Sequence, residues 1–175
     1  TALRCGCFII QQLPMAGRER AKLGKEVAEI SRLTVGDVMN EQVPQLRLMS
    51  RTPDIVTVGA GGNDVRSFDR RQFTQDAKEL VELLPPTAYV ADGPHFIHSW
   101  WTGNADAAAE VMASELRAKG RDVVPLHAQM RAQGRRALVT QFAADVFHPN
   151  DRGYRVWARA FWSQIEPDLS GAKYP

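Results

Sequence analysis

The sequence has few cysteines and lacks any long apolar run. Its two cysteines, Cys5 and Cys7, are separated by one residue, a spacing too tight for an unstrained disulfide. A disulfide scaffold is therefore not expected, and the compartment stays open between the cytoplasm and secretion after removal of a signal peptide. No apolar stretch approaches the roughly 20 residues that a membrane-spanning helix needs, so we expect no membrane span.

A large excess of charge of either sign is also missing. The chain carries 22 lysine and arginine residues against 20 aspartate and glutamate residues, a net charge of +2. Because nucleic-acid binding depends on a strongly basic surface, we expect no nucleic-acid partner. The length of 175 residues predicts a single domain over residues 1–175 with one core, but it does not indicate an oligomeric state.

Predicted strands and helices alternate along the chain. Short apolar stretches bounded by glycine or proline predict strands within residues 53–62, 85–94 and 121–128. Apolar residues at helical spacing predict helices over residues 70–84, 104–120 and 151–165, the second with Asn104 as its cap. Strands that alternate with helices of this length are typical of βαβ units and a parallel sheet. In such sheets the chemistry gathers in loops at the carboxyl ends of the strands.

The run Gly61-Gly62-Asn63-Asp64 directly follows the first of these strands. Glycines let the backbone turn sharply and approach a ligand closely. The side-chain amide of Asn63 is suited to donate a hydrogen bond to an oxyanion. The alternative is a tight turn in which Asn63 or Asp64 caps the following segment, and the run alone does not decide between the two.

A second polar motif lies just before the last predicted helix. Asp145 stands three residues before His148, and Pro149 and Asn150 follow. A carboxylate and an imidazole at this spacing can form the orienter and the base of a hydrolase. The alternative is a capping turn, with Asn150 or Asp151 at the start of the helix.

Together and in this order, the two motifs resemble those of the SGNH hydrolases, also called the GDSL esterase/lipase family. The third block of that family, Gly-x-Asn-Asp, is matched by residues 61–64, and the fifth, Asp-x-x-His followed by Pro-Asn, is matched by residues 145–150. The resemblance extends over about residues 32–162. It implies a flavodoxin-like, three-layer α/β/α sandwich with a parallel sheet of four or five strands, and hydrolysis of small-molecule esters or related acyl bonds.

The resemblance also implies a role for each matched residue. His148 would be the general base and then the general acid, and Asp145 would orient it and stabilise its imidazolium. Asn63 would donate its side-chain amide to the oxyanion. Such chemistry proceeds through an acyl-enzyme and needs no cofactor.

The nucleophile of the family is missing, because Gly-Asp-Ser does not occur anywhere in the chain. Cys7, in the run Cys-Gly-Cys-Phe, has a faint likeness to that block, but it stands only 24 positions before Ser31. Ser31 occupies the register of a glycine whose backbone N–H joins the oxyanion hole, and it is also a candidate nucleophile. Residues 1–30 are therefore atypical of the family. An altered or truncated N-terminal segment, an inactive relative, and a substitute serine all stay open.

An aromatic stretch over residues 92–104 follows the second predicted strand. Its members His98, Trp100 and Trp101, together with Gly62, are candidates to line the substrate pocket; the alternative is a loop pinned by its own aromatic packing. His95 and His98 have the spacing of a metal-binding pair, and His127 ends the next strand. No cysteine or carboxylate cluster completes this set in the sequence, so no metal site is expected.

These observations predict a hydrolase of carboxylic esters assisted by His148 and Asp145. Two other function classes remain. One is a binding protein on the same scaffold that has lost its nucleophile. The other is a metal-dependent hydrolase that would use His95, His98 and His148.

Overall fold

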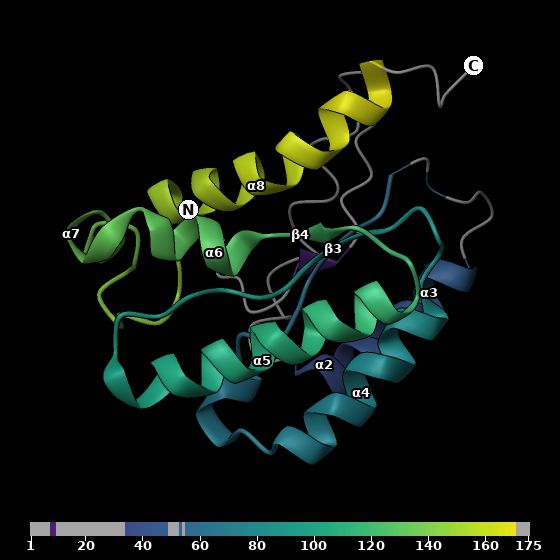
Figure 1. Cartoon of the computed structure of the whole chain (residues 1–175), viewed down its shortest axis with the longest axis horizontal. Helices are drawn as coiled ribbons and strands as arrows, with labels where there is room; N and C mark the ends of the chain where they lie inside the picture. Colours follow the sequence, from purple (N-terminus) through teal and green to yellow (C-terminus); the bar gives the residue numbers. More distant parts are fainter. Residues whose placement is uncertain (1–7, 10–33, 49–52, 54, 171–175) are drawn as a thin grey trace.

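The computed structural model describes residues 8–9, 34–48, 53 and 55–170. Figure 1 shows a small central sheet with helices on both faces. Helices α4 (Arg70–Leu83) and α5 (Ser99–Ala118) cover one face, and α6 (Leu126–Ala132) and α8 (Asp151–Ser170) cover the other. The predicted α/β/α sandwich is confirmed by this layered arrangement.

The sheet has the order β1-β2-β3-β4. Its strands are β1 (Phe8–Ile9), β2 (Thr57–Gly59), β3 (Tyr89–Ala91) and β4 (Val123–Val124). Strands β2, β3 and β4 are parallel, as predicted, with Val58 paired with Val90 and Val90 paired with Val123. Strand β1 pairs antiparallel with β2, so the described residues contribute three parallel strands where four or five were expected. A strand of two residues is too short to show a periodicity, and β1 was not predicted.

Shorter helices fill the rest of the described chain. The segment before β2 forms α2 (Val35–Asp37), a π-helical turn η2 (Val38–Gln42) and α3 (Val43–Leu48). A 3₁₀ turn, η3 (Asp64–Ser67), follows β2, and α7 (Gly134–Val139) follows α6. None of the described helices is both long enough and apolar enough to pass through a membrane.

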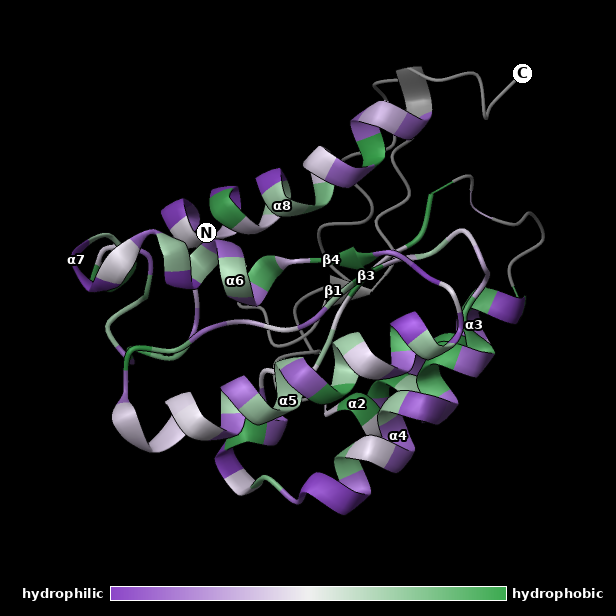
Figure 2. Ribbon diagram, in the orientation of Figure 1, coloured by the Kyte–Doolittle hydropathy of each residue, from purple (hydrophilic) through white to green (hydrophobic). Residues whose placement is uncertain are grey.

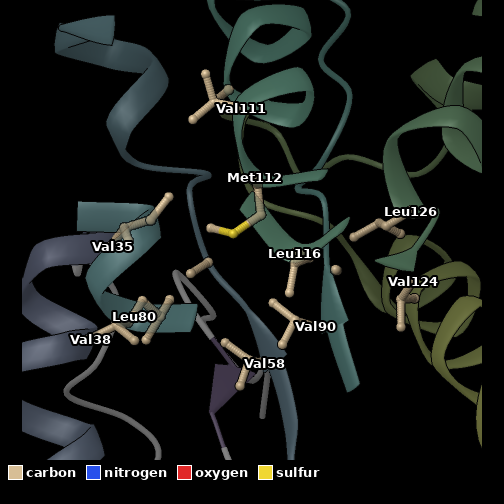
Figure 3. Packing of buried hydrophobic residues seen from close by; sticks show 14 of the residues in the cluster. Val35, Val38, Val58, Leu80, Val90, Val111, Met112, Leu116, Val124 and Leu126 are labelled. Carbon is tan, nitrogen blue, oxygen red and sulfur yellow. The ribbon is translucent and has the colours of Figure 1, made fainter. Parts of the chain in front are cut away.

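The core lies between the sheet and the two helical layers. The central strands are hydrophobic, whereas hydrophobic and hydrophilic residues alternate along the helices around them (Figure 2). Val58 and Val90 are fully buried and pack with Met112 and Leu116 of α5 in one hydrophobic cluster (Figure 3). Burying a side chain of this kind contributes roughly 1.5–3 kcal/mol, so this cluster fixes the strands, and with them the loops at their carboxyl ends.

Helix α5 begins earlier than its sequence predicts. It starts at Ser99, after the extended His98, so Asn104 lies inside the helix rather than at its cap. The side-chain amide of Asn104 donates to the carbonyl of Val65 in η3 at 2.8 Å. The sequence predicted Asn104 as a cap because asparagine is common at helix starts, but its side chain instead bonds a residue distant in sequence. As a result, Trp100 and Trp101 lie in the first turn of a helix and not in a loop.

Candidate active site

The predicted pair of Asp145 and His148 is formed. Nδ1 of His148 donates to Oδ2 of Asp145 at 2.5 Å. The other carboxylate oxygen accepts from the backbone N–H groups of Phe147 at 3.1 Å and His148 at 3.0 Å. Burial raises the pKa of Asp145, but the hydrogen bonds from the His148 ring and the two backbone groups outweigh it and hold the pKa below its usual value. The carboxylate is thus kept ionised beside the imidazole.

The second ring nitrogen of His148 is available for chemistry. Because Nδ1 carries the proton donated to Asp145, a neutral ring presents a lone pair at Nε2. Nε2 is buried and has no hydrogen-bond partner among the described residues. An oriented imidazole with one bonded and one unbonded nitrogen is the arrangement that a general base requires. The candidate nucleophiles Cys7 and Ser31 lie outside the described residues.

Asn150 holds the His148 loop against its surroundings. Its side-chain oxygen accepts from the backbone N–H groups of Arg152 and Gly153 and so caps α8. Its side-chain nitrogen donates to the carbonyls of Thr140 and Phe142. The capping interpretation of this motif is therefore confirmed together with the Asp145–His148 pair, because one loop does both.

The glycine-rich run after β2 turns sharply at Gly61. Its φ is +93°, and a Cβ there would lie 3.3 Å from the ring of Phe73. Only glycine adopts such a conformation without strain. The turn brings the half-buried Asn63 to the carboxyl edge of the sheet, where it lines a cavity of about 570 Å³. Gly62 is buried in the turn and does not line this cavity.

Asp64 connects this turn to a distant segment. Its carboxylate accepts from the backbone N–H of Val35, at 3.1 Å for the nearer oxygen. The predicted alternative, a tight turn in which Asn63 or Asp64 caps the following segment, holds only in part. Asn63 occupies the N-cap position of η3, but its side chain makes no capping hydrogen bond there. The carboxylate of Asp64 instead accepts from the backbone N–H of Val35 at the start of α2. Burial raises the pKa of Asp64 to about 6, despite the hydrogen bond from Val35. A bond between residues so far apart in sequence has no local signal.

Thr34 also stabilises the start of α2, as its N-cap residue. Its hydroxyl accepts from the backbone N–H of Asp37, while the Asp37 carboxylate accepts from the backbone N–H of Thr34 at 2.8 Å, which makes a capping box. The start of α2 is therefore held both by its own cap and by Asp64.

The structure brings the two sequence motifs together through Arg66 and Phe147. The guanidinium carbon of Arg66, in η3, lies 5.2 Å from the centre of the Phe147 ring. Phe147 in turn packs edge-on against the His148 ring, with ring centres 5.2 Å apart. The turn that carries Asn63 thus lies against the loop that carries His148. Arg66 and Phe147 were not recognised in the sequence, since neither belongs to a motif with chemistry of its own.

The aromatic residues predicted for the pocket pack mostly on one another. Trp101 packs edge-on against Phe147, with ring centres 5.0 Å apart, and edge-on against His98, with ring centres 5.4 Å apart. Trp100 is 69% exposed and stacks on His98, with ring centres 4.6 Å apart. The cavity that Asn63 lines includes neither His98 nor the two tryptophans. These contacts match the aromatic packing of the alternative, although that alternative was a loop and the two tryptophans lie in the first turn of α5.

The remaining histidines do not pair as their spacing indicated. His98 stacks on Trp100, whereas His95 lies edge-on to His127 with ring centres 4.8 Å apart. Asp106 of α5 completes this second group, so the expectation that no carboxylate joins these histidines is wrong. Asp106 was missed because it stands in the first turn of a predicted helix, 11 residues after His95 and 21 residues before His127. The triple His95, His98 and His148, considered for a metal-dependent hydrolase, is not assembled.

Comparison with known proteins supplies a family and a fold. The family model described as "GDSL-like Lipase/Acylhydrolase family" matches residues 12–156. No significant match occurs among curated proteins. A solved structure, that of LAE5, an alpha/beta hydrolase enzyme from the metagenome of Lake Arreo, Spain, is similar with a TM-score of 0.63 and 24% identity. The match covers 78% of this chain and 70% of that chain, and at this identity it establishes the fold.

Proposed function

Because the chain belongs to the GDSL-like lipase/acylhydrolase family, we propose that it hydrolyses small-molecule carboxylic esters through an acyl-enzyme. The observation that carries the proposal is the Asp145–His148 pair. One ring nitrogen of His148 is held by the carboxylate, and the other is buried with no hydrogen-bond partner among the described residues. That second nitrogen, Nε2, would accept the proton of the nucleophile and then donate it to the leaving group.

The proposed reaction begins when the nucleophile attacks the ester carbonyl carbon and gives its proton to Nε2 of His148. Asp145 stabilises the imidazolium that forms. The carbonyl oxygen becomes an oxyanion, which accepts hydrogen bonds from the side-chain amide of Asn63 and from the backbone N–H of Ser31. Collapse of this intermediate breaks the bond to the alkoxide, which takes the proton back from Nε2 and leaves as the alcohol. Water, deprotonated by His148, then attacks the acyl carbon. The bond from this carbon to the nucleophile breaks, the nucleophile takes the proton back from Nε2, and the acid is released.

We place the nucleophile in the segment before Thr34, where Ser31 and Cys7 are the candidates. Both lie outside the described residues. From Thr34 on, the chain is anchored by the Thr34–Asp37 capping box and by Asp64, which itself follows Asn63. The proposal that Ser31 serves as the nucleophile rests on its place in the sequence, three residues before this anchored helix start. A thiolate from Cys7 beside the imidazole would serve the same chemistry.

The proposal is tested by hydrolysis of a short-chain aryl ester with the full chain. His148→Ala should lower kcat/KM by at least about 10³-fold, whereas Asp151→Ala, which removes an exposed side chain three residues further on, should not. Circular dichroism checks that both variants are folded. Turnover that survives unchanged in His148→Ala would remove His148 from the mechanism.

The same assay identifies the nucleophile. Ser31→Ala keeps the backbone N–H but removes the hydroxyl, and Cys7→Ala removes the thiol. We expect one of the two substitutions to abolish turnover and the other to leave most of it. If both variants hydrolyse the ester at the wild-type rate, the nucleophile is neither of them.

A second candidate function is a binding protein without turnover, and the absence of Gly-Asp-Ser from the chain favours it. The wild-type protein separates the two. Ester hydrolysis that depends on His148 supports the enzyme. Binding of an unhydrolysed ester, measured by calorimetry in the absence of any turnover, supports the second function.

A further inference from the structure

Three side chains from three separate segments converge on the carboxyl side of β3 and β4. His95 follows β3, Asp106 lies in α5 and His127 lies in α6. One nitrogen from each histidine and one carboxylate oxygen lie within 4.8 Å of one another. We propose that these three residues bind one divalent metal ion of the zinc class. The site uses none of the residues assigned to ester hydrolysis.

The donor atoms are of the kind and at the separation that zinc requires. Zinc binds imidazole nitrogen and carboxylate oxygen at about 2.0–2.2 Å, which in a tetrahedral site places neighbouring ligand atoms roughly 3.3 Å apart. Oδ1 of Asp106 lies 2.8 Å from Nε2 of His127 and 3.8 Å from Nδ1 of His95. These two distances bracket the expected value. The two histidine nitrogens lie within 4.8 Å of each other, so a movement of at most about 1.5 Å would bring them to the separation that one tetrahedral ion requires.

The surroundings of His127 orient it as a ligand. Its Nδ1 lies 3.2 Å from the carbonyl oxygen of Pro94, which only accepts, so Nδ1 carries a proton. Its backbone N–H donates to Asp92 at 2.9 Å. Metal-binding histidines commonly hold their second nitrogen on a carbonyl in this way. A neutral His127 then directs the lone pair of Nε2 at the carboxylate of Asp106.

A lone pair and a carboxylate oxygen 2.8 Å apart repel each other unless a positive charge lies between them. A metal ion supplies that charge and binds both atoms. A second proton on the His127 ring would also supply it, and this is the alternative that the experiment must exclude.

His95 provides a second observation in favour of a metal ion, which a second proton on His127 would not explain. Its Nδ1 is buried and has no hydrogen-bond partner among the described residues. Leaving a buried polar atom unpaired costs about 1–3 kcal/mol, and a metal ion would satisfy it. The competing cation is Arg131, whose Nη1 lies 3.8 Å from Oδ1 of Asp106. The side chain of Arg131 is 66% exposed and can turn to solvent.

Three protein ligands leave one coordination position for water. The ion would tie the segment after β3 to α5 and α6, and so stabilise the folded chain against unfolding. The effect on stability gives a test that does not depend on catalysis.

The test is calorimetric titration of the chelator-treated full chain with zinc chloride, with thermal unfolding measured on the same samples. We expect one equivalent of zinc to bind and to raise the Tm. Asp106→Asn keeps the size of the side chain but removes the charged ligand, and it should weaken zinc binding by about 100-fold or more. Loss of a residue that only hydrogen-bonds a metal ligand already lowers metal affinity by about 10- to 100-fold. His95→Ala and His127→Ala should do the same.

Two control variants keep all three ligands. His98→Ala removes the histidine three residues from His95, and Arg131→Gln removes the neighbouring cation; both should bind one equivalent. The proposal is overturned if the wild-type protein binds no zinc. It is equally overturned if Asp106→Asn binds as tightly as the wild type, or if His98→Ala loses binding.

Discussion

The guanidinium of Arg66 lies over the ring of Phe147, 5.2 Å from its centre. Arg66 follows the turn that carries Asn63, and Phe147 precedes His148. This one contact therefore joins the turn that follows the proposed oxyanion donor to the loop that carries the proposed base. A pairing of a cation with an aromatic face contributes roughly 0.5–1 kcal/mol at an exposed site, which is enough to bias the position of a loop.

Arg66→Ala should loosen this contact. We expect a loss of about 0.5–1 kcal/mol in the free energy of unfolding and a lower kcat for ester hydrolysis, because Asn63 and His148 are then held less firmly relative to each other. Arg66→Lys should retain part of both. The measurements are urea unfolding and steady-state kinetics, with Arg71→Ala, another exposed arginine, as the control. An Arg66→Ala variant with wild-type kcat would show that the contact does not position the site.

Asp145→Asn should preserve the shape of the turn but remove the charge that orients His148. An amide that donates to Nδ1 would hold the ring in the wrong tautomer, and the expected loss in kcat is about 10⁴-fold. Asp151→Asn, which alters an exposed carboxylate six residues away, is the matched control. Equal kcat values for Asp145→Asn and wild type would refute the role of Asp145.

Asp64 should make the protein less stable as the pH rises from about 4 to 6. Its pKa is raised from 3.8 to about 6 in the folded protein, so between these values the folded state binds more protons than the unfolded chain. The free energy of unfolding therefore falls as the pH rises through this window, by roughly 3 kcal/mol at most from this group. Below pH 4 the contribution is fully favourable.

Asp64→Asn removes the ionisation but keeps an oxygen for the N–H of Val35. Its stability relative to the wild type should increase between pH 4 and 7, as measured by urea unfolding at several pH values. Asp122→Asn, which removes an exposed carboxylate, should not show this increase. A constant difference between Asp64→Asn and wild type over this range would contradict the prediction.

Gly153→Ala should disturb the loop of His148. A Cβ at Gly153 would lie 2.3 Å from the carbonyl oxygen of Gln141 and 2.8 Å from the ring of Pro149. Because backbone must shift to accept it, we expect a lower Tm and a lower rate of ester hydrolysis. Gly103→Ala is the control. It lies inside α5 with open space around it and should raise stability by up to about 1 kcal/mol. Two variants with the same Tm would contradict the prediction.

The sequence by itself determined the features that depend on neighbours along the chain. The spacing of apolar residues predicted α4 over residues 70–84, and the helix runs over Arg70–Leu83. The pairing of Asp145 with His148 and the cap formed by Asn150 also involve residues only a few positions apart, so their geometry follows from the local turn.

Tertiary structure alone decided the contacts that join distant segments. The backbone N–H of Val35 donates to Asp64, and the side chain of Asn104 donates to the carbonyl of Val65. These bonds, the Arg66–Phe147 contact and the cluster of His95, Asp106 and His127 all depend on how the helices pack on the sheet. No periodicity or short motif predicts these long-range contacts, because the burial of the core residues brings the segments together.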